Sequence, residues 1–178
     1  MASLATRMTG AMKADVATFE EIERDPSAMG QAVTVIVIAG VATLIGNLFR
    51  AGIGYGVSML IISLVGYAIW AVIVTLVGTK VMPEPTTKAD FAETFRTIGF
   101  AASPGVFNVL AIIPFLGPFL GFLISIWSLV IMVVAVRTVL DYSNTGRAII
   151  VVLIGWVIQL IITFLIMAPL MVGAAIMR

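Results

Sequence analysis

Few side chains in this sequence could carry out chemistry, and the most conspicuous group is a cluster of carboxylates near the N-terminus. It consists of Glu20, Glu21, Glu23 and Asp25. Three- and four-residue spacings make them neighbours on a helix, so in principle they could hold a divalent cation. Cation-binding loops instead alternate oxygen ligands around a glycine turn, which this segment lacks. We therefore interpret the cluster as a solvated helix face and expect no metal site.

The types of residue in the sequence do not favour a catalytic or cofactor-binding site. The chain contains no histidine and no cysteine, which removes the commonest ligands of zinc, haem and iron–sulfur clusters and any Ser–His or thiol catalysis. The glycine-rich stretch at 52–56 lacks the Lys-Ser/Thr pair of a phosphate-binding loop. We expect no enzyme, no catalytic residue and no cofactor. The net charge of +1 likewise predicts no nucleic-acid partner.

The composition is that of a membrane protein. Of the 178 residues, 61% are hydrophobic and 11% are charged, whereas soluble domains have about 25% charged residues. A membrane-crossing helix needs about 20 apolar residues. Residues 26–178 are therefore predicted to form one all-α polytopic domain, preceded by a cytoplasmic segment at 1–25. Its five transmembrane helices are expected at residues 27–49, 57–78, 97–113, 117–136 and 148–168.

The N-terminal segment has the pattern of an amphipathic helix that ends at Asp25-Pro26. Its polar face carries more acids than bases, which does not favour binding to anionic lipid. A basic protein partner, or the basic loop ends of the chain's own helix bundle, fits this face better. The apolar face consists of Met8, Met12, Val16, Phe19 and Ile22.

Glycines, prolines and a capping pattern should delimit the spans. Three glycines within 52–56 predict a turn or a loosely wound entry to the second span. Thr87 with Asp90 three residues later predicts the start of an interfacial helix that continues into the third span. Pro104 should kink that span, because proline removes a helix hydrogen bond. Pro169 should interrupt the fifth span.

The distribution of Lys and Arg predicts the orientation in the membrane. With five spans, the N-terminal segment, the second-to-third loop and the fourth-to-fifth loop share one side, and these segments contain all the Lys and Arg residues except Arg50 and Arg178. Because cytoplasmic loops are rich in Lys and Arg, the N-terminus should be cytoplasmic and the C-terminus outside.

The polar residues within the spans are Ser, Thr and three amides. No span contains an ionisable acid or base, so coupling of transport to protons or sodium is not expected. The amides could line a pore, or they could form hydrogen bonds between helices. They are Asn47, Asn108 and Gln159.

Small and polar residues at four-residue spacing mark two helix faces on which another helix could approach closely. The candidates are Gly117, Gly121 and Ser125 in the fourth span and Gly155, Gln159 and Thr163 in the fifth. These faces could pack within the monomer or form a homo-oligomer contact.

The order of several short motifs resembles the Yip (Ypt-interacting protein) family over nearly the whole chain. The resemblance implies a five-span helical protein with a cytoplasmic N-terminus and no enzymatic activity. Eukaryotic members are tied to Rab-type GTPases in Golgi and endoplasmic-reticulum membranes. This chain lacks their long N-terminal region and resembles the compact bacterial members of the plasma membrane, so the resemblance does not extend to GTPase binding. The motifs are TFEEIERDP at 18–26, FAASP at 100–104, IWSLV at 126–130 and DYSNTGRA at 141–148.

Two hypotheses of different classes follow. The first is a non-enzymatic adaptor or accessory subunit that lies in the lipid bilayer and binds other membrane proteins or itself, or organises the membrane. The alternative is a small channel or transporter for a neutral or apolar solute. A water-filled cavity lined by Asn108 and Gln159 would favour transport, whereas a solid bundle with an exposed small-residue face would favour assembly.

Overall fold

The computed structural model describes residues 2–176, and within this range the side chains at 50–52, 55–56, 59 and 166–176 are not described. The described residues form helices and connecting loops without a strand, and five segments are long and apolar enough to cross a membrane. The elements are α1 (Leu4–Met12), α2 (Val16–Arg24), α3 (Ala28–Leu76), the π-helical turn η1 (Val77–Val81), α4 (Phe91–Ala101), the 3-10 helix η2 (Ser103–Ile112), α5 (Leu116–Val139) and α6 (Thr145–Ile176).

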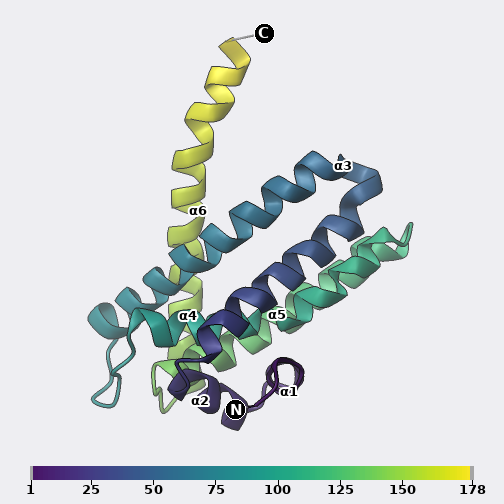
Figure 1. The fold of residues 1–178 in the computed structure, drawn as a ribbon. Helices are drawn as coiled ribbons and strands as arrows, with labels where there is room; N and C mark the ends of the chain where they lie inside the picture. Colours follow the sequence, from purple (N-terminus) through teal and green to yellow (C-terminus); the bar gives the residue numbers. More distant parts are fainter. Residues whose placement is uncertain (1, 177–178) are drawn as a thin grey trace.

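Helix α3 supplies the first two membrane-spanning segments. These are Ala28–Phe49 and Leu60–Val81, the second of which includes η1. Figure 1 shows α3 running away from the N-terminal end, reversing direction at its far end and returning. The sequence predicted a turn or a loosely wound entry at the glycines of 52–56, and the chain does reverse direction between the two spans (Figure 1), although helical hydrogen bonding continues through this stretch. Glycines are among the sites where long helices bend sharply.

The third span, Phe91–Ile112, combines two helix types. Helix α4 begins after Asp90, whose carboxylate accepts a hydrogen bond from the Glu93 N–H while the Glu93 carboxylate accepts one from the Asp90 N–H. Pro104 lies in the first turn of the 3-10 helix η2, directly after α4 ends. The helix type therefore changes where proline cannot donate the hydrogen bond of an α-helix.

Among its described side chains, α6 has its fully buried residues in its first half. Ala148, Val151 and Val152 are buried, whereas Leu160 is 68% exposed. In Figure 1 the C-terminal half of α6 extends away from α3 and α5. The helix continues past Pro169 to Ile176, so the predicted interruption was wrong. Membrane helices tolerate proline when neighbouring groups satisfy the freed carbonyl.

The N-terminal segment forms two short helices, α1 and α2, in place of a single amphipathic helix. Ala14 between them adopts a positive φ of 55°. Asp15 then caps α2 by accepting a hydrogen bond from the Thr18 N–H at 3.1 Å, which favours a new helix start. Of the predicted apolar face, Phe19 and Ile22 are fully buried against the bundle and Met8 and Met12 are partly buried, whereas Val16 is exposed.

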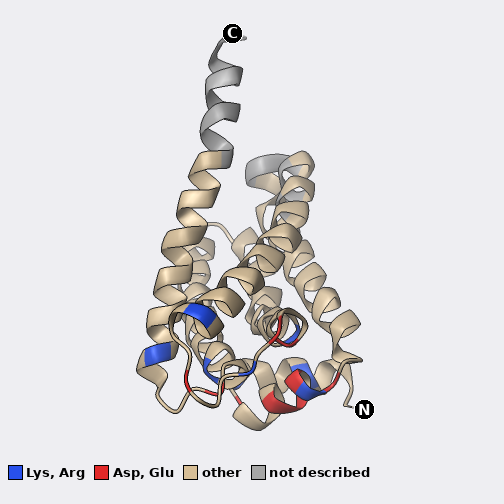
Figure 2. Ribbon diagram, turned by 90° about the vertical axis from the view of Figure 1, so that its left-hand side faces the viewer, with Lys and Arg blue, Asp and Glu red and all other residues tan. Residues whose placement is uncertain are grey.

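One end of the molecule carries the charges. Figure 2 shows the coloured Lys, Arg, Asp and Glu residues gathered at the end that contains the N-terminal helices. We call this the charged end and define it by α1, α2 and the loops at 82–90 and 140–144. The membrane-spanning helices extend from it, as hydropathy requires.

Candidate functional site

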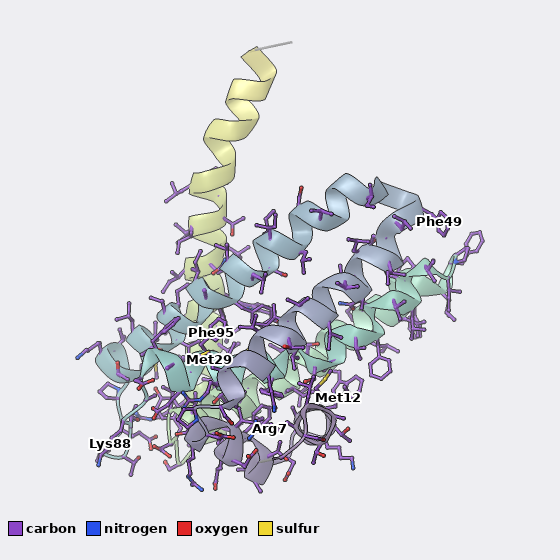
Figure 3. The ribbon with its side chains drawn as sticks, viewed as in Figure 1. Arg7, Met12, Met29, Phe49, Lys88 and Phe95 are labelled. Atoms are coloured by element: carbon purple, nitrogen blue, oxygen red, sulfur yellow. The ribbon has the colours of Figure 1, made fainter. Side chains whose placement is uncertain are left out.

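A buried arginine holds the N-terminal helices to the bundle. Arg7 of α1 is 1% exposed. Its guanidinium donates to Glu21 at 2.9 Å (Nε to Oε2), to Oε1 of Gln31 at 2.9 Å, and to the Asp25 carboxylate. One side chain thus joins α1, α2 and the first turns of α3. Figure 3 shows Arg7 at the end of the molecule opposite Phe49.

The carboxylates of the predicted cluster are mostly paired with arginines. Hydrogen bonds from Ser27 and from Arg7 lower the pKa of Asp25 to about 2. The hydrogen bond to Glu21 in turn raises the pKa of Arg7. Glu20 pairs with Arg24 on the solvent side at 3.1 Å. Within residues 2–176, no group of three or more carboxylates is placed to hold a metal ion.

A second buried arginine contacts the C-terminal end of α2. Arg96 of α4 is 6% exposed, and its guanidinium donates to the backbone oxygens of Ile22, at 3.3 Å, and Glu23. A cation at a helix C-terminus is favoured by the helix dipole. The N-terminal segment therefore docks on Arg96 through its backbone, while its acidic side chains pair with Arg7 and Arg24 of the same segment.

The carboxyl group of Glu23 is the unusual acid of this region. Its burial, followed by the nearby carboxylates of Asp141 and Glu93, raises the pKa of Glu23 to about 7. Burial disfavours the ionised carboxylate, and neighbouring negative charges add to that effect. The docked position of α2 thus favours the protonated form of this side chain.

Side-chain contacts join the two loops of the charged end. The Tyr142 hydroxyl donates to the Met82 carbonyl at 2.7 Å, and burial raises the pKa of this phenol. The Glu84 carboxylate accepts a hydrogen bond from the Ser143 N–H at 3.1 Å and lies 3.3 Å from the Arg147 guanidinium. The segment at 141–148, which contains the DYSNTGRA motif, thus connects the start of α6 to the loop after η1.

The structure places the three amides of the spans in different settings. Asn47 donates to the Thr43 carbonyl of its own helix at 2.9 Å. Asn108 of η2 donates to the Thr43 hydroxyl at 3.0 Å and so joins η2 to α3. The buried Oε1 of Gln159 has no hydrogen-bond partner among the described residues.

Three adjoining cavities lie among the spans. The first, which we call the central cavity, has a volume of about 320 Å³ and lies between the two arms of α3, η2 and α5. The second, of about 300 Å³, shares Asn108 and Ser128 with the central cavity. The third, of about 270 Å³, shares Tyr67 with it and includes Gln159 of α6. Asn108 and Gln159 therefore line different cavities.

The predicted small-residue face of α5 is in close contact at one position. Gly117 is buried, and a Cβ atom there would lie 2.5 Å from the Ala111 carbonyl oxygen. At Gly121 no atom lies within 4 Å of the corresponding point, and Ser125 is exposed. This face therefore remains open beyond the first turn of α5.

The corresponding face of α6 is divided in the same way. Gly155 is buried, and a Cβ atom there would lie 2.8 Å from the Trp70 ring. One turn further, the amide of Gln159 is partly buried and lines the third cavity, and two turns further Thr163 is exposed. The face begins as a contact within the monomer and ends on the outside of the bundle.

Close contacts at glycines also occur between α3 and the α4–η2 segment. Cβ atoms on Gly99 and Gly105 would lie 2.9 and 2.7 Å from the Cβ atoms of Ala32 and Ala39. Gly46 likewise faces the η2 backbone. The three small residues of α3 in these contacts, Ala32, Ala39 and Gly46, are spaced seven residues apart. This spacing in the sequence could have predicted the contact.

Comparison with known proteins identifies the family of the chain. Curated proteins and solved structures provide no match. The Yip1 domain model, in contrast, matches residues 10–167. This match covers Arg96 with its α2 partners, the cavities and all five spans up to the outer half of α6, whereas Arg7 lies just before it. Because it extends over most of the sequence, the protein belongs to the Yip1 family.

Proposed function

We propose that this Yip1-family protein is a non-enzymatic adaptor that binds a transmembrane helix of another membrane protein or of a second copy. The binding surface is the α6 face, which we define by Trp156, Gln159, Leu160, Thr163 and Phe164. These positions follow the three- and four-residue spacing of one side of a helix. The observation that carries the proposal is that this side leaves the bundle while still bearing polar groups.

Exposure and hydrogen bonding on the α6 face support this proposal. Leu160 and Phe164 are 68% and 70% exposed, and Trp156 is 50% exposed. The Gln159 Oε1 atom lacks a partner among the described residues. Helices in lipid associate through close packing and through hydrogen bonds between polar side chains, because an unpaired polar group is unfavourable in hydrocarbon. A partner helix with a polar side chain would form a hydrogen bond with the exposed Thr163 hydroxyl of this face.

The proposed orientation places the charged end in the cytoplasm and the C-terminus outside, in a bacterial plasma membrane. The Lys and Arg residues of the loops support it, because such residues are enriched on the cytoplasmic side. A cytoplasm-dependent reporter inserted at Thr86 should be active, and a reporter that requires the outside should be active after Arg178. The reversed pattern would refute both the orientation and the five-span arrangement.

Site-specific photo-crosslinking in native membranes tests the adaptor proposal. A photoreactive amino acid at Leu160 or Phe164 should yield covalent polypeptide adducts. Ile61 of α3, which is 60% exposed on another side of the bundle, is the matched control and should react with lipid only. An adduct of twice the 18.9 kDa chain mass would identify a second copy, and a different mass another protein.

Substitution of the polar side chains on the α6 face tests whether binding at this face is selective. Gln159→Leu combined with Thr163→Val should abolish the polypeptide adducts at Leu160, because these substitutions remove the hydrogen-bonding groups and keep the apolar surface. Equal polypeptide adducts from Leu160 and Ile61, or adducts that survive the double substitution, would refute selective binding at the α6 face.

A second candidate function is passage of a neutral solute, which the cavities among the spans favour. Their lining contains amides and hydroxyls without an acid or base. Proteoliposomes should then equilibrate glycerol faster than empty liposomes, as measured by light scattering after an osmotic step. Asn108→Leu should abolish this increase if the solute passes beside the central cavity. Equal rates with and without protein would exclude this function.

A further inference from the structure

The central cavity is a membrane-embedded space with a polar lining. It lies halfway along the first arm of α3, beside the start of η2 and the middle of α5. Its volume of about 320 Å³ falls at the lower end of the range for small-molecule sites in proteins. Five of its lining residues carry neutral hydrogen-bonding groups, namely Thr43, Ser63, Tyr67, Asn108 and Ser128.

Hydrogen bonding within the protein uses only part of this polar lining. The Thr43 hydroxyl donates to the Ala39 carbonyl and accepts a bond from Asn108, and the Ser63 hydroxyl donates to the Leu60 carbonyl. The hydroxyls of Tyr67 and Ser128 make no side-chain hydrogen bond with the described residues. Each can donate one hydrogen bond and accept others. The cavity thus holds two unused donors in a region without bulk water.

The charge of the lining restricts the occupant. None of its residues is an acid or a base other than the phenol of Tyr67. A phosphate or ammonium group would enter a low-dielectric site without a counter-charge, which is far more costly than burial of a hydroxyl. The occupant should therefore be neutral and should carry a group that both accepts and donates hydrogen bonds.

The surroundings of the cavity accommodate an apolar tail. Ile62, which lines it, is 46% exposed, so the cavity reaches the side of the bundle at hydrocarbon depth. The adjoining cavity of about 300 Å³ is lined by Gly121, Leu129 and Trp156 in addition to the two shared residues. The empty space beside Gly121 on α5 belongs to this second cavity. An acyl chain placed in this second cavity would run along apolar side chains toward the lipid.

We propose that the central cavity binds a neutral lipid with a free hydroxyl head, of the monoacylglycerol type, through Tyr67, Asn108 and Ser128. The hydroxyls of the glycerol group accept from Tyr67 and Ser128 and donate back to the polar lining. The acyl chain occupies the adjoining cavity and leaves into the bilayer. The proposal goes beyond the adaptor function: its head-group residues do not belong to the α6 face, and the adjoining cavity shares only Trp156 with that face.

Photolabelling of the full chain in phosphatidylcholine nanodiscs tests the proposal. The probe is a monoacylglycerol with a diazirine in its acyl chain. Labelling should be saturable, should map to peptides of η2 and α5, and should be displaced by unlabelled mono-oleoylglycerol. Lysophosphatidic acid with the same acyl chain differs only in its phosphate and should not displace the probe. Absence of saturable labelling, or equal displacement by both competitors, would overturn the proposal.

Matched variants separate binding in the cavity from general membrane contact. Tyr67→Phe and Ser128→Ala should each weaken binding about five- to tenfold, the effect of one lost hydrogen bond. Thr34→Val is the control, because the Thr34 hydroxyl donates to its own helix on an exposed face. It should bind as the unmodified chain does. Unchanged affinity in both Tyr67→Phe and Ser128→Ala would overturn the assignment.

A steric variant tests the location and separates this proposal from the adaptor function. Ser128→Phe places a ring where the two cavities meet and should abolish labelling while the protein keeps its thermal unfolding transition. Crosslinks from Leu160 and Phe164 should persist in this variant, because these two residues line neither cavity. Full labelling of a folded Ser128→Phe protein would overturn the proposal even if the crosslinks are seen.

Discussion

Replacement of Arg7 by methionine should weaken the attachment of α1 and α2 to the bundle. The substitution keeps an apolar side chain of similar length but removes all the donors that reach Glu21, Asp25 and Gln31. These acceptors would then remain in place without a positive partner. We expect local opening of α1 and α2 while the membrane-spanning helices stay folded, because α1 contacts the bundle only at its periphery.

The structure sets the size of this effect. Removing one member of a fully buried ion pair costs about 3–5 kcal/mol. The Glu21 and Asp25 side chains are 41% and 23% exposed, so water would partly replace the lost arginine. We therefore expect about 2–3 kcal/mol, reduced from the buried-pair value for solvent screening. The indole of Trp127 also donates to the Met12 carbonyl at 2.9 Å and should keep α1 near the bundle.

Hydrogen exchange of backbone amides measures this opening directly. Amides in the last turn of α1 should exchange about 30- to 150-fold faster in Arg7→Met, which corresponds to 2–3 kcal/mol. Arg24→Met is the matched control, because Arg24 is 75% exposed and its pair with Glu20 is worth about 0.5 kcal/mol or less. If the α1 amides of Arg7→Met exchange as slowly as those of Arg24→Met, the reasoning is refuted.

Three further substitutions test other contacts. Tyr142→Phe removes the donor to the Met82 carbonyl and should lower the free energy of unfolding by about 1 kcal/mol. An unchanged midpoint of thermal unfolding would show that this hydrogen bond does not stabilise the fold. The raised pKa of Glu23, about 7, means that the folded state retains a proton which the unfolded state, with a pKa near 4.5, releases. Stability should therefore fall as pH rises from about 4.5 to about 7, and Glu23→Gln should remove this dependence; parallel pH profiles for the two proteins would contradict it. Gly99→Leu should destabilise the bundle by about 1–3 kcal/mol or more, because the new side chain would overlap with Ala32. Gly121→Leu is the control and should have little effect on the monomer, because the space beside Gly121 is open. Equal unfolding midpoints for the two variants would contradict the packing described for α3 and α4.

Local properties of the sequence determine the membrane-spanning architecture. A segment enters the membrane according to its own length and hydropathy, so the five apolar helices could be predicted without tertiary contacts. The start of α4 was predicted at Thr87 with Asp90, three residues too early, because the capping pair is Asp90 with Glu93. The predicted interruption at Pro169 failed because proline only permits such a break, and the surroundings of the helix decide whether it occurs.

Contacts between distant residues are what only the tertiary structure decided. Arg7 carries no feature in the sequence that distinguishes it from the exposed Arg24, yet it is buried because α1 and α2 fold back toward Gln31. Thr87, predicted at a helix start, instead donates to the carbonyl of Leu140 in another loop. The central cavity exists because Asn108 meets Thr43 across 65 positions of sequence. Hydropathy acts on each segment alone, whereas these pairings depend on the angles at which the completed helices cross.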